Sequence, residues 1–463
     1  MTTENYDLVI VGSGSGNSVI SDEMSDWRIA IVERWTFGGT CLNRGCIPSK
    51  MLIYAADVAE SAANDNRPKY GVTTSFESAD WQSIVQRVFG RIDPIAEGGL
   101  QYRHSLPNVT VYEGNAMFVG ERTLEVNGVT ISGERIVLAN GARSFIPDIH
   151  GIDEVPYHTS DTIMRIAHLP KHLIVIGGGF IAAELSHVFG SLGSRITIIN
   201  RSHHLLRAED DDISRRYTEL AAERFELVLG AQVRRIHMTA EGVGVHVTTD
   251  DGDVTVGGDT LLVAAGRQPN GDTLDAAKAG IEIGDMGEVI VDEFGRTTAD
   301  GVWALGDVNG RHQLKHMANG EAKVVHHNLL HPDDPMPLDT RAAPYAVFGS
   351  PQIGTVGLTE TQARNLGQPV SVITHEYGGA AYGWALEDTT SFCKLIGDPA
   401  TRMLLGAHVI GYQASILVQL LVQGMHLGST VDELAVGQIW IHPALSEVVE
   451  QALLKLIEAF DLD

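Results

Sequence analysis

Residues 6–20 read YDLVIVGSGSGNSVI, a run of β-branched and apolar residues that ends in closely spaced glycines. The pattern predicts a buried strand, a tight turn and a helical stretch, and a second strand, RIAIVE at 28–33, ends in Glu33. Such a unit binds dinucleotides, because glycines let the backbone approach a pyrophosphate and a terminal carboxylate accepts hydrogen bonds from ribose hydroxyls. Asn17 stands where the third glycine of the usual pattern would be, with Gly16 beside it. The turn residues expected to bind the nucleotide are Gly12, Ser13, Gly14 and Gly16.

A second unit of the same kind begins at residues 173–184, LIVIGGGFIAAE, where Gly177 and Gly179 follow another buried strand. The next strand, RITIIN, ends in Asn200 and Arg201, and Arg207 follows six residues later. Arginines can pair with a 2′-phosphate, which an acid at this position would repel. The first unit therefore suits a nucleotide with a free ribose diol and the second suits NADP, unless the arginines are merely exposed on a surface loop.

The chain returns to the first unit after the second. VAAGRQPN at 263–270 leaves the second unit, and TTADGVWALGDV at 297–308 ends a further strand at Gly306 and Asp307. From about 340, short alternating segments and helical stretches predict a separate α+β domain. Its last helix would place Val448, Leu453, Leu454 and Ile457 on one face. We therefore expect an α/β protein divided into 1–150 and 268–338 (first nucleotide unit), 151–267 (second unit) and 339–463 (α+β domain).

The composition and net charge of the chain restrict its possible binding partners and its cellular compartment. The 463 residues include 33 basic and 59 acidic ones, for a net charge of −26, which disfavours nucleic acid and anionic membranes as partners. No apolar run approaches the roughly 18 residues of a spanning helix, and the N-terminus lacks the basic region of a signal peptide. Three cysteines fit a reducing compartment, and we expect the cytoplasm.

Two of the three cysteines stand together in GGTCLNRGCIPSK, residues 38–50. A zinc site needs about four ligands and no partner pair exists, so no metal is expected; inert buried thiols or a redox-active disulfide remain. Positions i and i+5 of an ideal helix lie about 8.7 Å apart between Cα atoms. A disulfide tolerates about 4.4–6.8 Å, so a Cys41–Cys46 bridge needs a distorted turn. Gly45 and Pro48 make that distortion feasible.

This segment closely resembles the active-site segment of the flavin- and pyridine-nucleotide-dependent disulfide reductases. The motifs follow in the same order along the chain: first nucleotide unit, CxxxxC, second unit, GDV segment and C-terminal HP…E. Within the family, the likeness is greatest to the mycothione reductases, through GSGSGNS, WQSIVQRVFGRIDPIAEGG, YGGAAYGWALED and WIHPALSEVVE.

The resemblance implies FAD on the first unit, NADPH on the second, and a C-terminal domain that forms a homodimer. Hydride would pass from NADPH to FAD, which reduces the disulfide; Cys46 would face the flavin and Cys41 would attack the substrate. Lys50, paired with Glu184, would lie near the flavin. His442, oriented by Glu447, would act as acid and base across the dimer. Further residues assigned to cofactor binding by the resemblance are Gly39, Thr40, Ala116, Gly141, Phe180, Ile181, Gly266, Arg267 and Lys315.

The expected function is NADPH-dependent reduction of a low-molecular-weight disulfide, with mycothione yielding two mycothiol. Glutathione reductase is an alternative, disfavoured by Asp22 and Glu23 where those enzymes supply an arginine to the substrate. Dihydrolipoamide dehydrogenase uses NAD, which the two arginines disfavour. Soluble transhydrogenases lack the cysteine pair, and mercuric reductases carry a C-terminal pair that this chain lacks. A non-catalytic flavoprotein interaction subunit is the alternative of another class. Cys393 is expected to pack in the core.

Overall fold

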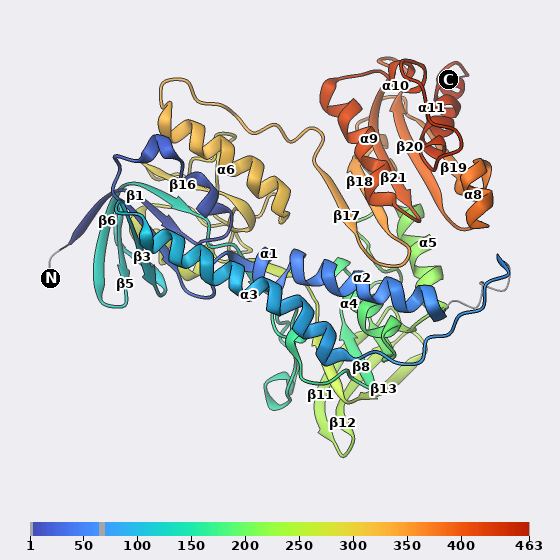
Figure 1. The fold of residues 1–463 in the computed structure, drawn as a ribbon, viewed down its shortest axis with the longest axis horizontal. Coiled ribbons are helices and arrows are strands. Elements are labelled where there is room, and N and C mark those ends of the chain that lie inside the picture. The colour runs from blue at the N-terminus through green and yellow to red at the C-terminus, as the bar shows by residue number, and fades with distance from the viewer. Residues whose placement is uncertain (1–2, 64–69, 463) are drawn as a thin grey trace.

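The computed structural model describes residues 3–63 and 70–462, and its first sheet is built around the opening strand (Figure 1). The sheet order is β3-β2-β1-β6-β5-β4, with β16 beside β6. Strands β3, β2, β1, β6 and β16 are parallel neighbours, and β4–β6 form an antiparallel meander. The strand bounds are β1 Glu4–Val11, β2 Ile29–Glu33, β3 Val109–Glu113, β4 Ala116–Gly120, β5 Thr123–Val126, β6 Val129–Leu138 and β16 Val302–Ala304.

The second sheet has the parallel order β10-β9-β8-β14 and an antiparallel three-stranded sheet, β11-β12-β13, next to it. A short ladder between β7 and β15 lies where the chain passes between the two nucleotide units. The strands of these three sheets are β7 Ala142–Ser144, β8 His172–Ile176, β9 Arg195–Ile199, β10 Glu226–Val228, β11 Gln232–Thr239, β12 Gly242–Thr249, β13 Gly252–Gly258, β14 Thr260–Val263 and β15 Arg267–Pro269.

The C-terminal unit is a five-stranded antiparallel sheet in the order β17-β18-β21-β20-β19. It lies at the upper right of Figure 1, and helices α9, α10 and α11 pack on it. Its elements are β17 Pro344–Val347, β18 Ile353–Gly357, α7 Glu360–Arg364, β19 Ser371–Glu376, α8 Ala381–Leu386, β20 Phe392–Asp398, β21 Met403–Ile410, α9 Ala414–Leu427, α10 Val431–Val436 and α11 Glu447–Phe460.

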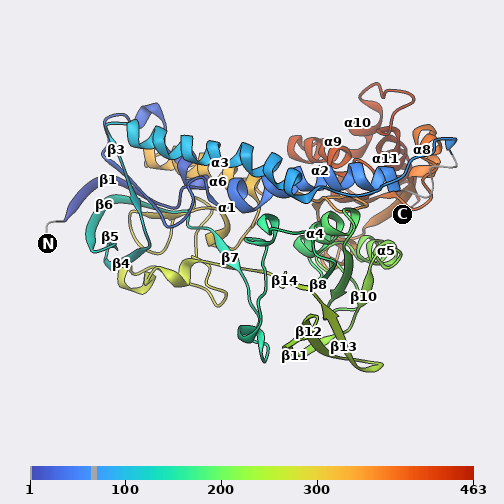
Figure 2. The same ribbon diagram turned by 60° about the horizontal axis from the view of Figure 1, so that its bottom comes forward.

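Helices α2 and α3 run together along one side of the molecule (Figure 2) and connect the region of the first sheet with the other units. α2 follows α1 directly, and it packs against α4 of the second unit. The remaining helices are α1 Gly39–Arg44, α2 Cys46–Ala63, α3 Trp81–Ser105, α4 Phe180–Ser191, α5 Asp211–Ala222 and α6 Lys315–Leu330. The cysteine pair therefore lies at the start of the helix that links the units.

The prediction of a helical stretch after the first glycine turn is wrong. Residues 15–28 form two 3-10 turns, Ser15–Val19 and Asp22–Met24, in place of an α-helix. The segment SVISDEMSD contains three serines, two aspartates and two β-branched residues, which favour turns or lose side-chain freedom in a helix. Gly16 takes the place of the third glycine, because a Cβ at position 16 would lie 2.7 Å from the Cβ of Ala139. Asn17 instead accepts a hydrogen bond from Arg103 Nε at 2.8 Å.

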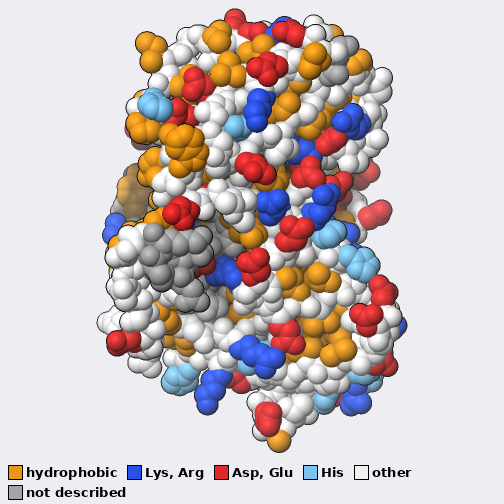
Figure 3. Space-filling view, turned by 90° about the vertical axis from the view of Figure 1, so that its right-hand side faces the viewer, with side chains coloured by type: hydrophobic (Ala, Val, Ile, Leu, Met, Phe, Trp, Pro, Cys, Tyr) orange, Lys and Arg blue, Asp and Glu red, His pale blue; other side chains and the backbone are white. Residues whose placement is uncertain are grey.

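The last helix is also only partly as predicted. Val448 and Leu453 are buried in α11, but Leu454 is 39% exposed, and Leu456 takes its place in the core. Figure 3 shows acidic and basic side chains mixed over one face of the molecule, with hydrophobic side chains gathered over its upper part. Within residues 3–63 and 70–462 there is no helix with the length and apolar content that crossing a membrane requires.

Candidate active site

A cavity of about 470 Å³ extends from the first glycine turn to the start of α2 and to α4. It brings together groups that are widely separated in the sequence, including the cysteine pair, the first glycine turn and the start of α4. The predicted residues that line it are Gly12, Gly14, Glu33, Gly39, Thr40, Cys41, Cys46, Lys50, Ala116, Gly141, Phe180, Ile181, Glu184, Arg267, Gly306, Asp307 and Lys315. The predicted residues outside it are Ser13, Gly16, Gly177, Gly179, Asn200, Arg201, Arg207, Gly266, His442 and Glu447.

Glu33 is held rigidly at the end of β2 by the first glycine turn. One carboxylate oxygen accepts hydrogen bonds from Ser13 N at 2.9 Å and Ser13 Oγ at 2.6 Å, and the other accepts one from Trp35 N. Gly12 has a φ of +104°, and a Cβ there would lie 2.3 Å from Ala139 O, so only glycine fits. The carboxylate thus faces the cavity in a fixed orientation, as ribose recognition requires.

The backbone forms a cradle between the first glycine turn and α1. A Cβ on Gly39 would lie 2.7 Å from Gly14 Cα, so any side chain there would fill the space. Lys315, at the start of α6, donates a hydrogen bond from Nζ to Ser15 Oγ at 2.7 Å and lines the same cavity. Glycine backbone, one ammonium and a fixed carboxylate at the end of β2 fit the pyrophosphate and adenosine parts of a dinucleotide such as FAD.

Asp307, in the 3-10 turn Gly306–Asn309 that follows β16, also lines the cavity. Burial raises the pKa of its carboxyl group, while the nearby Arg267, whose Nε lies 3.8 Å from it, acts in the opposite direction. Arg267 is itself fixed by a hydrogen bond from Nη2 to Ala142 O at 2.7 Å. An acid and a fixed arginine side by side offer both an acceptor and donors to a polyhydroxy chain in the cavity.

The cysteine pair lies at a break between two helices, as the distorted-turn prediction requires. α1 ends at Arg44, Gly45 has φ −133° and ψ −119°, and α2 begins at Cys46. A Cβ on Gly45 would lie 3.0 Å from Thr40 O. Both thiols are free in this structure and hydrogen-bonded to each other.

The two thiols differ in acidity. The hydrogen bond from Cys41, together with the charge of Lys50, lowers the pKa of Cys46 to about 7 against the opposing effect of burial. The same hydrogen bond, followed by burial, raises the pKa of Cys41 far above its ordinary value. In the reduced pair Cys46 is therefore the more acidic thiol, which ionises first, and Cys41 keeps its proton.

Lys50 lies one helical turn after Cys46 and contacts Glu184 of α4. Its Nζ donates to the two carboxylate oxygens at 2.8 and 2.7 Å. Glu184 is buried and also accepts a hydrogen bond from Phe348 N at 3.0 Å, while Lys50 Nζ lies 4.6 Å from the centre of the Phe348 ring. Phe180, the first residue of α4, is 46% exposed at the cavity.

The second glycine turn is built like the first but lies outside the cavity. Gly177 has a φ of +124°, and a Cβ there would lie 2.2 Å from Ala264 O. Gly179 precedes α4, and neither it nor Gly266 has a neighbour within 4 Å of an added Cβ, so both face open space. Arg201 and Arg207 are exposed, and neither forms an ion pair with any residue of 3–63 or 70–462.

His442 and Glu447 lie in the C-terminal unit, outside the cavity of their own chain. His442 Nδ1 lies 2.6 Å from Glu447 Oε1, and the other carboxylate oxygen accepts a hydrogen bond from Ala444 N. The hydrogen bond from His442 lowers the pKa of Glu447. The His442 side chain is 72% exposed, so its Nε2 is presented outward from the surface.

Comparison with known proteins identifies the family. Residues 6–322 match the pyridine nucleotide-disulphide oxidoreductase model, and residues 343–453 match the dimerisation domain of the same enzymes. The chain belongs to this family. It is 49% identical to a mycothione reductase of Mycobacterium tuberculosis, covering 98% of this chain and 100% of that one. It is 33% identical to a mercuric reductase of Lysinibacillus sphaericus, covering 93% and 79%. The structure of the HOCl-induced flavoprotein disulfide reductase RclA from Escherichia coli superposes with a TM-score of 0.84 at 30% identity, covering 99% and 100%.

Membership confirms the predicted fold class, the disulfide oxidoreductase activity and the flavoprotein character. Enzymes of this disulfide oxidoreductase family contain FAD and use NAD(P)H, and the cavity residues fit that cofactor. The matching dimerisation domain supports a homodimer. Cys393 is buried in β20, where burial raises the pKa of its thiol, in agreement with the predicted packing role.

Several residues of the disulfide oxidoreductase site were not predicted from the sequence. Phe348, which contacts both Lys50 and Glu184, comes from the C-terminal unit and belongs to no motif. The Cζ atoms of Arg34 and Arg44 lie 4.1 and 4.0 Å from the centre of the Trp35 ring, and all three residues line the cavity. The sequence RWTF at 34–37, directly after Glu33, was the available signal for an aromatic group at the nucleotide.

Proposed function

We propose that this protein is an NADPH-dependent reductase of a low-molecular-weight disulfide, with mycothione as the substrate. The observation that carries the proposal is the cysteine pair at the break between α1 and α2, with Lys50 one helical turn after Cys46 and fixed by Glu184. Identity of 49% with a mycothione reductase supports mycothione as the substrate. The exposed Arg201 and Arg207 support NADPH over NADH, because their charges are available to a 2′-phosphate.

The cofactor residues act by binding and orientation. When bound, FAD accepts a hydride from the nicotinamide and delivers two electrons to the disulfide. Glu33 holds the adenosine ribose, Lys315 and the glycine cradle hold the pyrophosphate, and Asp307 holds the polyhydroxy chain. Lys50, fixed by Glu184, keeps a positive charge beside Cys46 and stabilises its thiolate.

The substrate step uses Cys41 as the nucleophile. Because the pKa of Cys41 is raised, the thiol needs a base, and His442 takes its proton. Cys41 sulfur attacks one sulfur of the substrate, the substrate S–S bond breaks, and the imidazolium protonates the leaving thiolate. The Cys46 thiolate then attacks the Cys41 sulfur, breaks its bond to the second substrate sulfur and leaves a Cys41–Cys46 disulfide. The second product leaves as a thiolate and takes its proton from solvent. Two electrons pass from the cysteine pair to the substrate.

His442 performs this step from the partner subunit of the homodimer. Support comes from its position in the C-terminal unit, outside the cavity of its own chain, and from its outward exposure. Glu447 contacts Nδ1, so Nε2 is the nitrogen left to exchange the proton. The division into 1–150, 151–267, 268–338 and 339–463 is proposed with it, supported by the return of β16 to the first sheet.

The test is a comparison of kcat/KM for mycothione, glutathione disulfide and lipoamide, each with NADPH and with NADH. Preference for mycothione with NADPH supports the proposal. Preference for glutathione disulfide or lipoamide contradicts the substrate, and preference for NADH contradicts the nucleotide. The Cys46→Ser variant should lose all disulfide reduction, whereas Cys393→Ser, at a buried strand position, should retain it.

A further inference from the structure

The loop that carries Arg201 and Arg207 is a built structure between β9 and α5. At its start, Asn200 Nδ2 donates to the backbone oxygens of Ser202 and His204 at 3.0 and 2.9 Å. In its middle, Leu206 has a φ of +52° and donates from N to Gly178 O at 2.7 Å. The loop is thereby tied to the second glycine turn and follows the carboxyl end of β9, the end of a parallel strand at which nucleotides bind.

The end of this loop is held by a different part of the chain. Glu209 is buried and accepts a hydrogen bond from Thr355 Oγ1 of β18 at 2.9 Å. Asp210, also buried, accepts one from Glu360 N of α7 at 2.9 Å and caps α5 through Asp212 N. Two residues after Arg207, the loop therefore becomes part of an interface with the C-terminal sheet.

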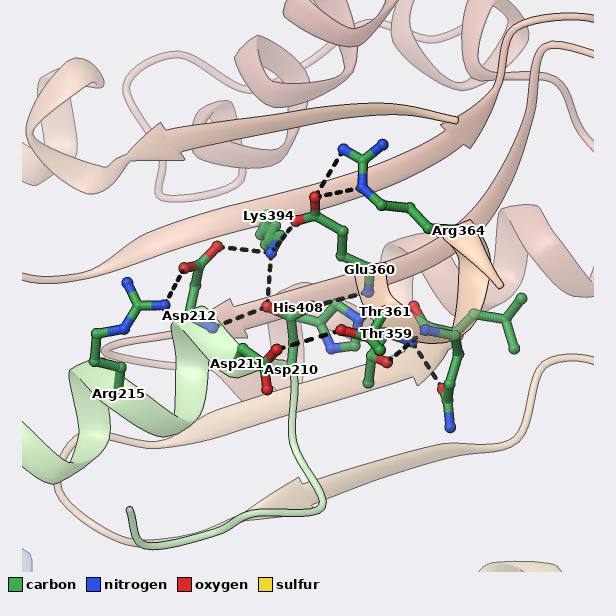
Figure 4. A network of polar contacts seen from close by, with 12 residues as sticks. Asp210, Asp211, Asp212, Arg215, Thr359, Glu360, Thr361, Arg364, Lys394 and His408 are labelled. Atoms are coloured by element: carbon green, nitrogen blue, oxygen red, sulfur yellow. Dashed lines mark hydrogen bonds and ion pairs between the residues drawn. The ribbon is translucent and has the colours of Figure 1, made fainter. Parts of the chain in front are cut away.

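Lys394 closes this interface. It lies on β20, its side chain is 1% exposed, and its Nζ is within 2.6–2.7 Å of three carboxylates, from Asp210, Asp212 and Glu360 (Figure 4). Arg215 pairs with Asp212 at 3.2 Å and Arg364 with Glu360 at 2.8 Å. Three cations and three carboxylates thus balance. A buried ammonium requires such partners, and the partners are equally dependent on the ammonium.

We propose that Lys394 is a positioning residue for recognition of the nucleotide 2′-phosphate, acting through Asp210 on the loop that presents Arg201 and Arg207. The inference rests on the proposed use of NADPH. It makes the C-terminal unit a determinant of nucleotide selectivity as well as the dimerisation domain. Lys394 itself does not touch the nucleotide, because it is enclosed by carboxylates at the opposite end of the loop.

Removal of the ammonium would affect the loop in a specific way. Without Lys394, the carboxylates of Asp210, Asp212 and Glu360 repel one another across the interface, and the loop end separates from β20 and α7. The glycine turn and Asn200 are held by other contacts, so the adenosine and pyrophosphate parts of the site are retained. The loss should therefore fall on the contacts of the 2′-phosphate.

The experiment measures binding of adenosine 2′,5′-bisphosphate and of adenosine 5′-monophosphate by calorimetry to the FAD-loaded enzyme. These ligands differ only in the 2′-phosphate. Lys394→Met should weaken binding of the bisphosphate about tenfold, equivalent to about 1.4 kcal/mol, and leave the monophosphate within about twofold of the unsubstituted protein. The ratio of KM values for NADPH and NADH should rise by a similar factor.

Arg402→Met is the matched control. Arg402 also joins two carboxylates, those of Asp432 and Asp461, but all three residues lie within the C-terminal unit and none contacts the loop. If this variant changes the bisphosphate selectivity as much as Lys394→Met does, a specific role of Lys394 is contradicted. If Lys394→Met does not fold, Thr355→Val removes one of the hydroxyls that hydrogen-bond Glu209 and should reduce the same selectivity about two- to threefold.

The outcomes separate this inference from the proposed function. If the unsubstituted protein does not prefer the bisphosphate, the proposed use of NADPH is wrong and the inference is overturned with it. If the protein prefers the bisphosphate and the preference is unchanged in the folded Lys394 or Thr355 variant, the positioning role is wrong and the proposed function stands.

Discussion

Lys50 Nζ lies 2.8 and 2.7 Å from the two carboxylate oxygens of Glu184, a residue 134 positions away in the sequence. The pair joins α2, which begins at the cysteine pair, to α4, which begins at Phe180. Two turns further along α2, Asp57 is joined to His187 of α4 at 2.8 Å. The helix that carries the thiols is thereby fixed against the helix of the second nucleotide unit, so the thiols and Phe180 share one cavity.

The contact predicts how the acidity of Cys46 depends on Lys50. Lys50→Met removes a cation that helps lower the pKa of Cys46 to about 7. In this variant the pKa of Cys46 should therefore rise by roughly one pH unit. At a pH below both values the thiolate fraction then falls about tenfold. The measurement is the pH dependence of Cys46 alkylation in the reduced protein, with the modified residue identified by mass spectrometry. Lys278→Met, which removes an exposed lysine paired with Asp275, is the control, and an unchanged midpoint for Lys50→Met would refute the assignment.

The position of His442 predicts the behaviour of hybrid dimers. A subunit with Cys41→Ser and Cys46→Ser and a subunit with His442→Gln should each form dimers whose disulfide reductase activity is reduced about 10²-fold or more. A hybrid of the two contains one site with intact cysteines and an intact histidine if the histidine acts across the interface. Such hybrids, purified with two different tags, should show about half of the unsubstituted activity, from one of two sites. Inactive hybrids would mean that His442 serves its own chain.

The two arginines of the second unit predict nucleotide selectivity. The double variant Arg201→Leu, Arg207→Leu loses two charge-assisted contacts to the 2′-phosphate, so KM for NADPH should rise roughly 10- to 100-fold. KM for NADH should change less than about twofold, since NADH has no phosphate there. Steady-state kinetics with both nucleotides measures this. Arg195→Leu, which removes a cation paired with Glu226 at the start of β9, is the control; equal losses with NADPH and NADH would contradict the prediction.

The buried Glu209 predicts a pH-dependent stability. Burial raises its pKa to about 7 from an ordinary 4.5, so between these values the native protein holds a proton that the unfolded chain releases. Stability contributed by this group therefore falls as the pH rises from about 4.5 to about 7.

Glu209→Gln stays neutral and keeps an oxygen that accepts from Thr355, so the variant should be more stable above pH 7. The gain is at most about 3 kcal/mol, at 1.36 kcal/mol per pH unit. Urea unfolding at about pH 5 and about pH 8 measures it, with Glu223→Gln, an exposed position after α5, as the control. A variant that is equally stabilised at both pH values would argue against titration of Glu209.

Local sequence patterns predicted the features that depend on residues close together in the chain. The glycine turns at 12–16 and 177–179 can be predicted from the sequence because the backbone there lies against another segment of the chain. A side chain would not fit, as the distances at Gly12 and Gly177 demonstrate. The break between Cys41 and Cys46 follows from helix geometry and Gly45. The same local reasoning failed at residues 15–28, where serines and aspartates replaced the expected helix with turns.

The amino-acid sequence by itself determined the two nucleotide units, the cysteine pair and the residue types available for the chemistry, because these depend on neighbours a few positions apart. Only the tertiary structure decided which of 59 acidic residues meets which cation. Glu184 pairs with Lys50, and Asp210 pairs with Lys394 from 184 positions away. No local pattern specifies such pairs, since a charge buried by the packing of distant segments selects its partner only when those segments meet.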